Sequence, residues 1–171
     1  MFAGAGPIIQ SAWVVRDFDE SLAVWIARGA GPFMVGRRMM IPLAYRGEPV
    51  ELELSVAWGQ FDGMQIELIE QLEEGPSMFR ELVPPGQSRI HHMSTYTDNF
   101  TGDLAHYRAQ GAEVVFSGLM KGAPVCWLDT VATLGFMTEL ITANPEKEKV
   151  FAMFREAAEN WDGIDPIRVI S

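Results

Sequence analysis

Residues 22–30, LAVWIARGA, recur 82 positions later as residues 104–112, LAHYRAQGA. The same shift aligns residues upstream of this segment. It places Ile8 over Ile90, Asp17 over Asn99, and Phe18 over Phe100. We interpret the chain as a divergent tandem repeat, in which each copy folds as the same structural unit.

Both copies carry the signals of a helix preceded by a strand. Asp17 and Asn99 are residue types that cap the first turn of a helix, because their side chains accept hydrogen bonds from free backbone N–H groups. Gly29 and Gly111 follow the helical pattern, where glycine commonly ends a helix. Apolar residues recur between these signals at helical spacing, so each helix is expected to bury one face.

Three strand candidates follow each helix, which predicts a β-α-β-β-β unit in each copy. The strand candidates are residues 8–15, 32–36, 50–58 and 64–70 in the first copy, and 89–97, 113–117, 125–128 and 136–142 in the second. We therefore predict an α+β fold with two tandem βαβββ modules, residues 7–70 and 88–142, forming a curved mixed sheet with a cleft. Together they would make one domain, residues 7–142, followed by a helix and tail at 143–171.

Two further segments lie outside the common pattern. Residues 37–49 have no counterpart in the second copy and are expected to form a loop beside a binding site. A helix beginning at Asn144 and Pro145 has an apolar stripe, which would cover either the domain's own sheet or a subunit interface. The stripe consists of Val150, Phe151, Phe154, Ala158 and Trp161.

Composition limits the possible functions. The 171 residues are 48% hydrophobic, which suits one folded domain, and the net charge of −10 argues against a nucleic-acid partner. The N-terminus does not resemble a signal peptide, and no apolar run reaches the roughly 18 residues of a membrane span, so a cytoplasmic location without membrane contact is expected. Cys126 is the single cysteine and is expected to be buried in a strand.

Four residues occupy matching strand positions in the two copies. Gln10 aligns with His92 in the first strands, and the last strands carry Glu67 and Glu139 among apolar residues. Each has an ordinary structural explanation by itself, but modules that pack as pseudo-symmetric halves would bring all four together. Three oxygen donors and one nitrogen suit one divalent metal ion in an open site, with Zn, Mn, Co, Ni and Fe left undistinguished.

The motifs around these four residues resemble those of the vicinal oxygen chelate superfamily, which includes glyoxalase I, methylmalonyl-CoA epimerase, extradiol dioxygenases and bleomycin-binding proteins. The motifs are Ile8-Ile9-Gln10, Gln65-Ile66-Glu67-Leu68-Ile69-Glu70, Ile90-His91-His92-Met93 and Phe136-Met137-Thr138-Glu139-Leu140. The resemblance implies that Gln10, Glu67, His92 and Glu139 are the metal ligands. Strand alternation would place His91 on the face opposite His92.

The resemblance also implies a reaction class. A substrate with two adjacent oxygens would chelate the metal, and Glu139, Glu67 or Glu51 would move a proton beside the chelated carbonyl. The product would identify an epimerase, an isomerase or a glyoxalase-type lyase, and the need for glutathione or CoA stays open. The alternatives are a metal-free binding protein of the bleomycin-resistance type and, less favoured because only one histidine occupies a ligand position, an extradiol dioxygenase. A homodimer is the expected assembly.

Overall fold

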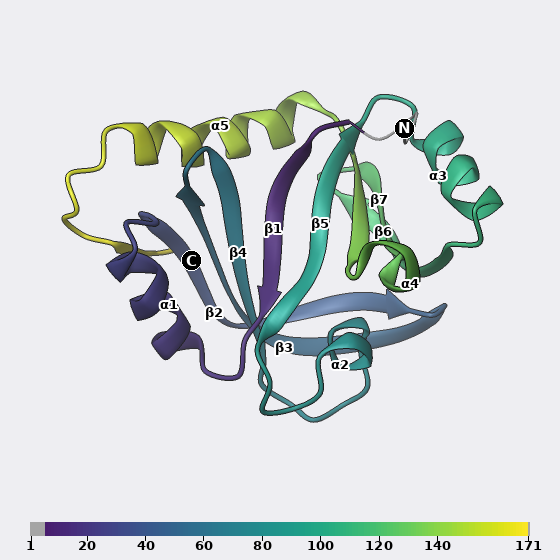
Figure 1. Ribbon diagram of the computed structural model, residues 1–171, viewed down its shortest axis with the longest axis horizontal. Coiled ribbons are helices and arrows are strands. Elements are labelled where there is room, and N and C mark those ends of the chain that lie inside the picture. The colour runs from purple at the N-terminus through teal and green to yellow at the C-terminus, as the bar shows by residue number, and fades with distance from the viewer. Residues whose placement is uncertain (1–5, 171) are drawn as a thin grey trace.

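The computed structural model describes residues 6–170, apart from the side chain of Leu43 (Figure 1). The first copy of the repeat forms β1 (Ile8–Val14), α1 (Phe18–Ala27), β2 (Phe33–Tyr45), β3 (Glu48–Phe61) and β4 (Met64–Gln71). A linker with α2 (Met78–Leu82) leads to the second copy, which forms β5 (Arg89–Thr97), α3 (Phe100–Ala109), β6 (Glu113–Met120), β7 (Ala123–Asp129), α4 (Val131–Leu134) and β8 (Met137–Thr142). The chain continues into α5 (Pro145–Glu159) and β9 (Ile167–Val169). The predicted α+β class, with a curved mixed sheet and a C-terminal helix, is confirmed.

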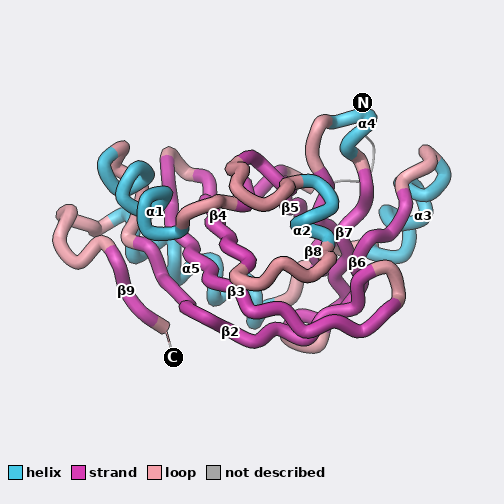
Figure 2. Tube along the Cα trace, turned by 90° about the horizontal axis from the view of Figure 1, so that it is seen from below, coloured by secondary structure: helices cyan, strands magenta, loops and turns pink. Residues whose placement is uncertain are grey.

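The two copies join where β1 runs antiparallel to β5, with Gln10 opposite Ser94 and Ala12 opposite His92. The sheet order is β3-β4-β1-β5-β8-β7-β6-β2-β9, and β2 also pairs with β3. Because this extra pairing connects β3, at one end of the series, to β2, the strand next to last, the strands from β3 to β2 follow a closed path and β9 is added at the edge of β2 (Figure 2). The last strand of each copy lies parallel to its first strand, β4 beside β1 and β8 beside β5. Four adjacent strands, in the order β4-β1-β5-β8, thus carry the four predicted site residues.

The helices form where the capping residues predict them. The side chain of Asp17 accepts a hydrogen bond from the Glu20 amide at 2.8 Å, and that of Asn99 accepts one from the Gly102 amide at 3.3 Å. Each helix then covers the outer face of its own module. Leu22 of α1 packs in one apolar cluster, and Tyr107 of α3 packs in another with Cys126, which is buried as expected.

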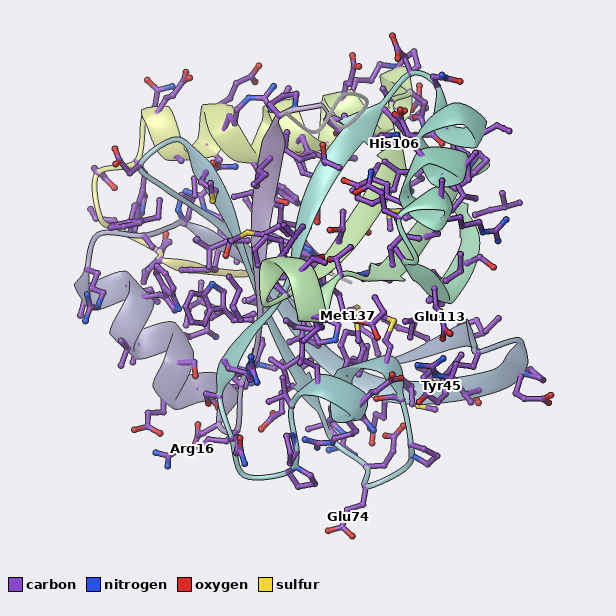
Figure 3. The ribbon with its side chains drawn as sticks, turned by 45° about the vertical axis from the view of Figure 1, so that its right-hand side comes forward. Arg16, Tyr45, Glu74, His106, Glu113 and Met137 are labelled. Atoms are coloured by element: carbon purple, nitrogen blue, oxygen red, sulfur yellow. The ribbon has the colours of Figure 1, made fainter. Side chains whose placement is uncertain are left out.

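The expectation of a loop at residues 37–49 is wrong, because these residues extend β2 and β3 into a long hairpin. A register shift between Gly36 and Met39 absorbs the irregular segment, and pairing then resumes as far as the turn at Arg46 and Gly47. The end of the hairpin reaches the second module. Arg46 donates its backbone N–H to the Val115 carbonyl at 2.9 Å, and Figure 3 shows Tyr45 near Glu113 at the start of β6. The hairpin therefore closes the sheet.

Helix α5 covers the domain's own sheet, which decides between the two expectations for its apolar stripe. In Figure 1 it lies across the top of the view, over the ends of β4, β1 and β5. The Phe154 ring stacks on Trp58 of β3 with centroids 6.5 Å apart, and Phe151 contacts Tyr96 of β5 edge-on. The chain then returns to add β9 beside β2, a strand that the sequence pattern did not predict.

Glycine is required at position 59 because the Phe33 ring packs directly on the backbone of β3. A Cβ atom at this position would lie 2.6 Å from Cε1 of Phe33, which is fully buried. We expect Gly59→Ala to lower the free energy of unfolding by about 1–3 kcal/mol through overpacking. Urea unfolding followed by circular dichroism measures this change.

Gly75→Ala is the matched control, since its Cβ would meet nothing closer than Cγ of Glu73 at 4.0 Å. Equal stability of the two variants would show that Phe33 does not constrain Gly59.

Candidate active site

The closed sheet and α5 surround a cavity of about 780 Å³, which we call the central cavity. Most of its lining side chains are apolar, including Leu54, Val56 and Phe116. The polar groups that matter for chemistry are those of Gln10, Gln65, Glu67, His92, Glu139 and Lys147. This volume is typical of sites for small organic ligands.

All four predicted ligand residues line the central cavity. Nε2 of His92 lies 3.4 Å from Oε2 of Glu67 and 3.6 Å from Oε2 of Glu139. Gln10 lies close to Glu139, since both side chains contact the Ser94 hydroxyl. That hydroxyl is 2.6 Å from Oε1 of Gln10 and within hydrogen-bond distance of the Glu139 carboxylate. The structure thus brings the four residues to one region from four adjacent strands.

Hydrogen bonds from other side chains orient the Glu67 carboxylate and the Gln10 amide. The indole N–H of Trp58 donates to Oε1 of Glu67 at 2.8 Å, which leaves Oε2 facing His92. The amide of Gln10 donates to Oε1 of Gln65 at 2.6 Å, which directs its own Oε1 toward Ser94. Such contacts restrict the orientation of the possible ligands. The sequence analysis did not identify Ser94, Trp58 or Gln65, although Ser94 lies two residues from His92 on the same strand.

A β-bulge places His91 next to the His92 ring. The register with β1 passes from His92 directly to Ile90, so His91 is an extra residue in the ladder and the expected alternation of faces fails there. Nδ1 of His91 lies 2.9 Å from Nδ1 of His92, and Nε2 of His91 lies 3.0 Å from the Met78 carbonyl. A carbonyl oxygen can only accept a hydrogen bond, so the ring proton of His91 is on Nε2. Nδ1 of His91 then accepts a hydrogen bond from the N–H at Nδ1 of His92. In the neutral tautomer, His92 therefore presents an Nε2 lone pair to Glu67 and Glu139.

The two histidines differ in charge preference. Burial and the adjacent His92 lower the pKa of His91 to about 3. Burial also lowers the pKa of His92, but the nearby carboxylates of Glu139 and Glu67 outweigh it and raise the pKa to about 9. Without a metal, a proton on His92 balances part of the negative charge of the two carboxylates.

The donor set fits a divalent metal chemically. Nε2 of His92 is buried without a hydrogen-bond partner, and its nearest charged neighbours are the two carboxylates. Donors that share an ion at about 2.1 Å lie roughly 3 to 4 Å apart, as Nε2 of His92 and each of the two carboxylates do. Within residues 6–170, however, no group of three or more His, Cys, Asp or Glu side chains has the arrangement of a complete metal cluster. The contacts are pairwise and centred on His92.

Glu51 does not join this group. It is exposed, and it is not part of the cavity lining. Strand alternation explains its position, since Leu52 and Leu54 of β3 are buried on the inner face and odd-numbered neighbours point outward. On this geometry, Glu67 and Glu139 are the carboxylates that can meet a ligand in the central cavity.

These features define a member of a fold class in which paired βαβββ units enclose a small-molecule cavity. Residues 9–127 match the family model of the Glyoxalase/Bleomycin resistance protein/Dioxygenase superfamily, and the chain belongs to this superfamily. No curated protein matches the sequence. No helix of residues 6–170 is long and apolar enough to cross a membrane.

Solved structures share the fold at low sequence identity. Methylmalonyl-CoA epimerase from Mycobacterium tuberculosis is 16% identical, with a TM-score of 0.54 over 85% of this chain and 91% of that one. A hypothetical protein from Bacillus halodurans C-125 is 14% identical, with a TM-score of 0.55 over 81% of this chain and 94% of that one. At these identities the likeness establishes the architecture only.

The raised pKa of His92 makes the stability of the metal-free protein depend on pH. Its folded pKa of about 9 exceeds the ordinary 6.5, so its contribution is complete below pH 6.5 and is lost as pH rises through 9. We expect chelator-treated protein to have a lower urea midpoint at pH 9.5 than at pH 7. His91 stays neutral across this window and adds nothing to the difference.

His92→Gln isolates the effect, because other groups that titrate at high pH remain in the variant. The part of the midpoint decrease that is due to His92 should disappear. An identical decrease in wild type and His92→Gln would contradict the assignment.

Proposed function

We propose that the protein is a divalent-metal-dependent enzyme that moves a proton on the carbon beside a chelated carbonyl. The observation that carries this proposal is the buried, unpartnered Nε2 of His92 between the carboxylates of Glu67 and Glu139. Gln10, Glu67, His92 and Glu139 would hold the ion, whose identity among Zn, Mn, Co, Ni and Fe stays open. When bound, the metal would polarise the substrate carbonyl and make the neighbouring C–H more acidic.

The carboxylates of Glu139 and Glu67 would have different roles in the reaction. The Glu139 side chain is 3% exposed and accepts a hydrogen bond from Ser94, which suits a fixed ligand. The Glu67 side chain is 14% exposed, so it has more access to a molecule in the central cavity. We therefore assign proton transfer to Glu67, and no role to Glu51.

The fate of the proton would set the product class. Its return to the same carbon from the other side gives an epimerase, and its delivery to a neighbouring atom gives an isomerase or a glyoxalase-type lyase. The epimerase name of the Mycobacterium tuberculosis structure agrees with this range of outcomes. The substrate would be a small molecule with adjacent oxygens, and the assembly in which it reacts would be a homodimer.

A metal-free binding protein is the second candidate. The apolar lining of the central cavity supports it, since such a surface binds bulky molecules without any reaction. An oxygenase has less support, because a single histidine, His92, lies among the four candidate ligands.

Metal content separates these candidates. We expect wild-type protein purified without chelator and dialysed to retain close to one divalent ion per chain, as measured by mass spectrometry of dissolved protein. Glu139→Gln removes a charged donor while keeping side-chain shape, so metal retention should fall at least about tenfold. Glu51→Gln is the matched control, because it makes the same chemical change outside the central cavity and should retain the metal.

The reaction class has its own measurement. When a substrate is turned over in D₂O, the carbon beside the chelated carbonyl should gain deuterium, and no O₂ should be consumed. Glu67→Gln should lower turnover at least about a hundredfold. Equal metal retention in wild type and Glu139→Gln would overturn the ligand assignment. Stoichiometric use of O₂ would replace proton transfer with oxygenation.

A further inference from the structure

Lys147 is a buried cation that the ligand set does not use. It lies in the first turn of α5, its residue is 4% exposed, and its side chain lines the central cavity. Among the described residues, its ammonium has no hydrogen-bond partner. A buried ammonium without a partner is costly, so this position calls for an interaction that the protein alone does not provide.

In the sequence, Lys147 lies within a charged segment that is typical of an exposed helix start, Pro145-Glu146-Lys147-Glu148-Lys149. Its neighbour Lys149 behaves as a surface residue, with a side chain that is 72% exposed and a 2.8 Å ion pair to Glu146. Lys147 instead precedes Val150, Phe151 and Phe154 at helical spacing. It therefore lies on the apolar stripe that faces the sheet.

The charges around Lys147 leave room for an anion. Burial lowers the pKa of Lys147, and the charges of Glu139 and Glu67, which line the same cavity, offset only part of this effect. A divalent ion would be neutralised by these two carboxylates, and His92 would bind it as a neutral imidazole. The positive charge of Lys147 would then have no counterpart, and a monoanionic ligand would supply one.

We propose that Lys147 is a substrate-binding residue that pairs with an anionic oxygen, a carboxylate or an enolate, on a molecule with an apolar body. This inference deepens the proposed function and rests on it for the orientation of the ligand toward the four donor residues. The anionic end lies between α5 and the carboxylate-bearing strands. The apolar body occupies the remainder of the 780 Å³ cavity, against Phe116, Trp127 and Phe154.

Lys147 also selects among substrate classes. A neutral ligand of the same shape would leave the ammonium unpaired, and the loss of one charge-assisted hydrogen bond changes affinity by about tenfold or more. A ligand with many negative charges would meet only two lysines in the cavity lining, Lys147 and the exposed Lys121, in a chain with a net charge of −10. The preferred ligands are therefore apolar molecules with a single anionic group.

The test compares two probes that differ in charge and share shape and adjacent oxygens, 3-hydroxy-2-naphthoate and 3-hydroxy-2-naphthamide. Calorimetry should show that wild type binds the carboxylate at least about tenfold more tightly than the amide. Lys147→Met keeps the length of the side chain and should lose most of this preference. Its affinity for the carboxylate probe should fall, and its affinity for the amide probe should not change. Lys147→Arg should keep a preference for the carboxylate.

Lys149→Met removes an equal charge from the exposed side of α5 and should bind both probes as wild type does. Full carboxylate affinity in Lys147→Met would overturn the proposal, as would an equal loss for both probes, which indicates a packing role. Circular dichroism and thermal unfolding of each variant show whether it has folded.

Each titration is run on zinc-loaded and on chelator-treated protein. A preference that depends on Lys147 in chelator-treated protein, combined with no metal uptake, would support this inference and overturn the metal-dependent function. Normal metal uptake with no effect of Lys147→Met would overturn the inference and leave the proposed function standing.

Discussion

The antiparallel pairing of β1 with β5 is the constraint on which the rest of the structure depends. It fixes Ala12 opposite His92 and Gln10 opposite Ser94, so the repeat exchanges the two pairs, because Gln10 aligns with His92 and Ala12 with Ser94. The parallel pairing of β4 with β1 and of β8 with β5 then brings the two glutamates to either side. A slip of one residue between β1 and β5 would turn their inward side chains outward. The cavity and its polar groups would be lost together.

The repeat made much of this arrangement predictable. A shared pattern of cap, apolar spacing and terminal glycine identified both helices, and matching strand positions identified four residues that the structure brings to one region. This succeeded because local sequence signals and packing agree in these elements. The role of the four as metal ligands stays a prediction.

Three features depended on contacts that no local pattern records. The β2–β3 hairpin extends because Arg46 and Tyr45 meet the second module, and a sequence reading sees only an insertion. The bulge at His91 breaks the alternation on which its predicted orientation relied. Glu51 and Glu67 both read as acidic strand residues, and only the direction of each strand face separates an exposed carboxylate from one in the cavity. Lys147 carried a usable signal, its spacing from Val150 and Phe154, but the charged residues around it concealed that signal.

Helix α5 bears on the stereochemistry of binding because it has no counterpart in the other copy of the repeat. The two modules contribute related strands to the cavity, and such a near-twofold arrangement has little means of distinguishing one end of a bound molecule from the other. No equivalent helix follows β4, where the chain enters a linker with the short α2 instead. The helix makes the cavity asymmetric, because it adds the buried Lys147, whereas the other lysine of the lining, Lys121, is exposed in the turn between β6 and β7. By the role proposed for Lys147, a molecule seated there would take a single orientation and would expose one of its two faces to a given carboxylate.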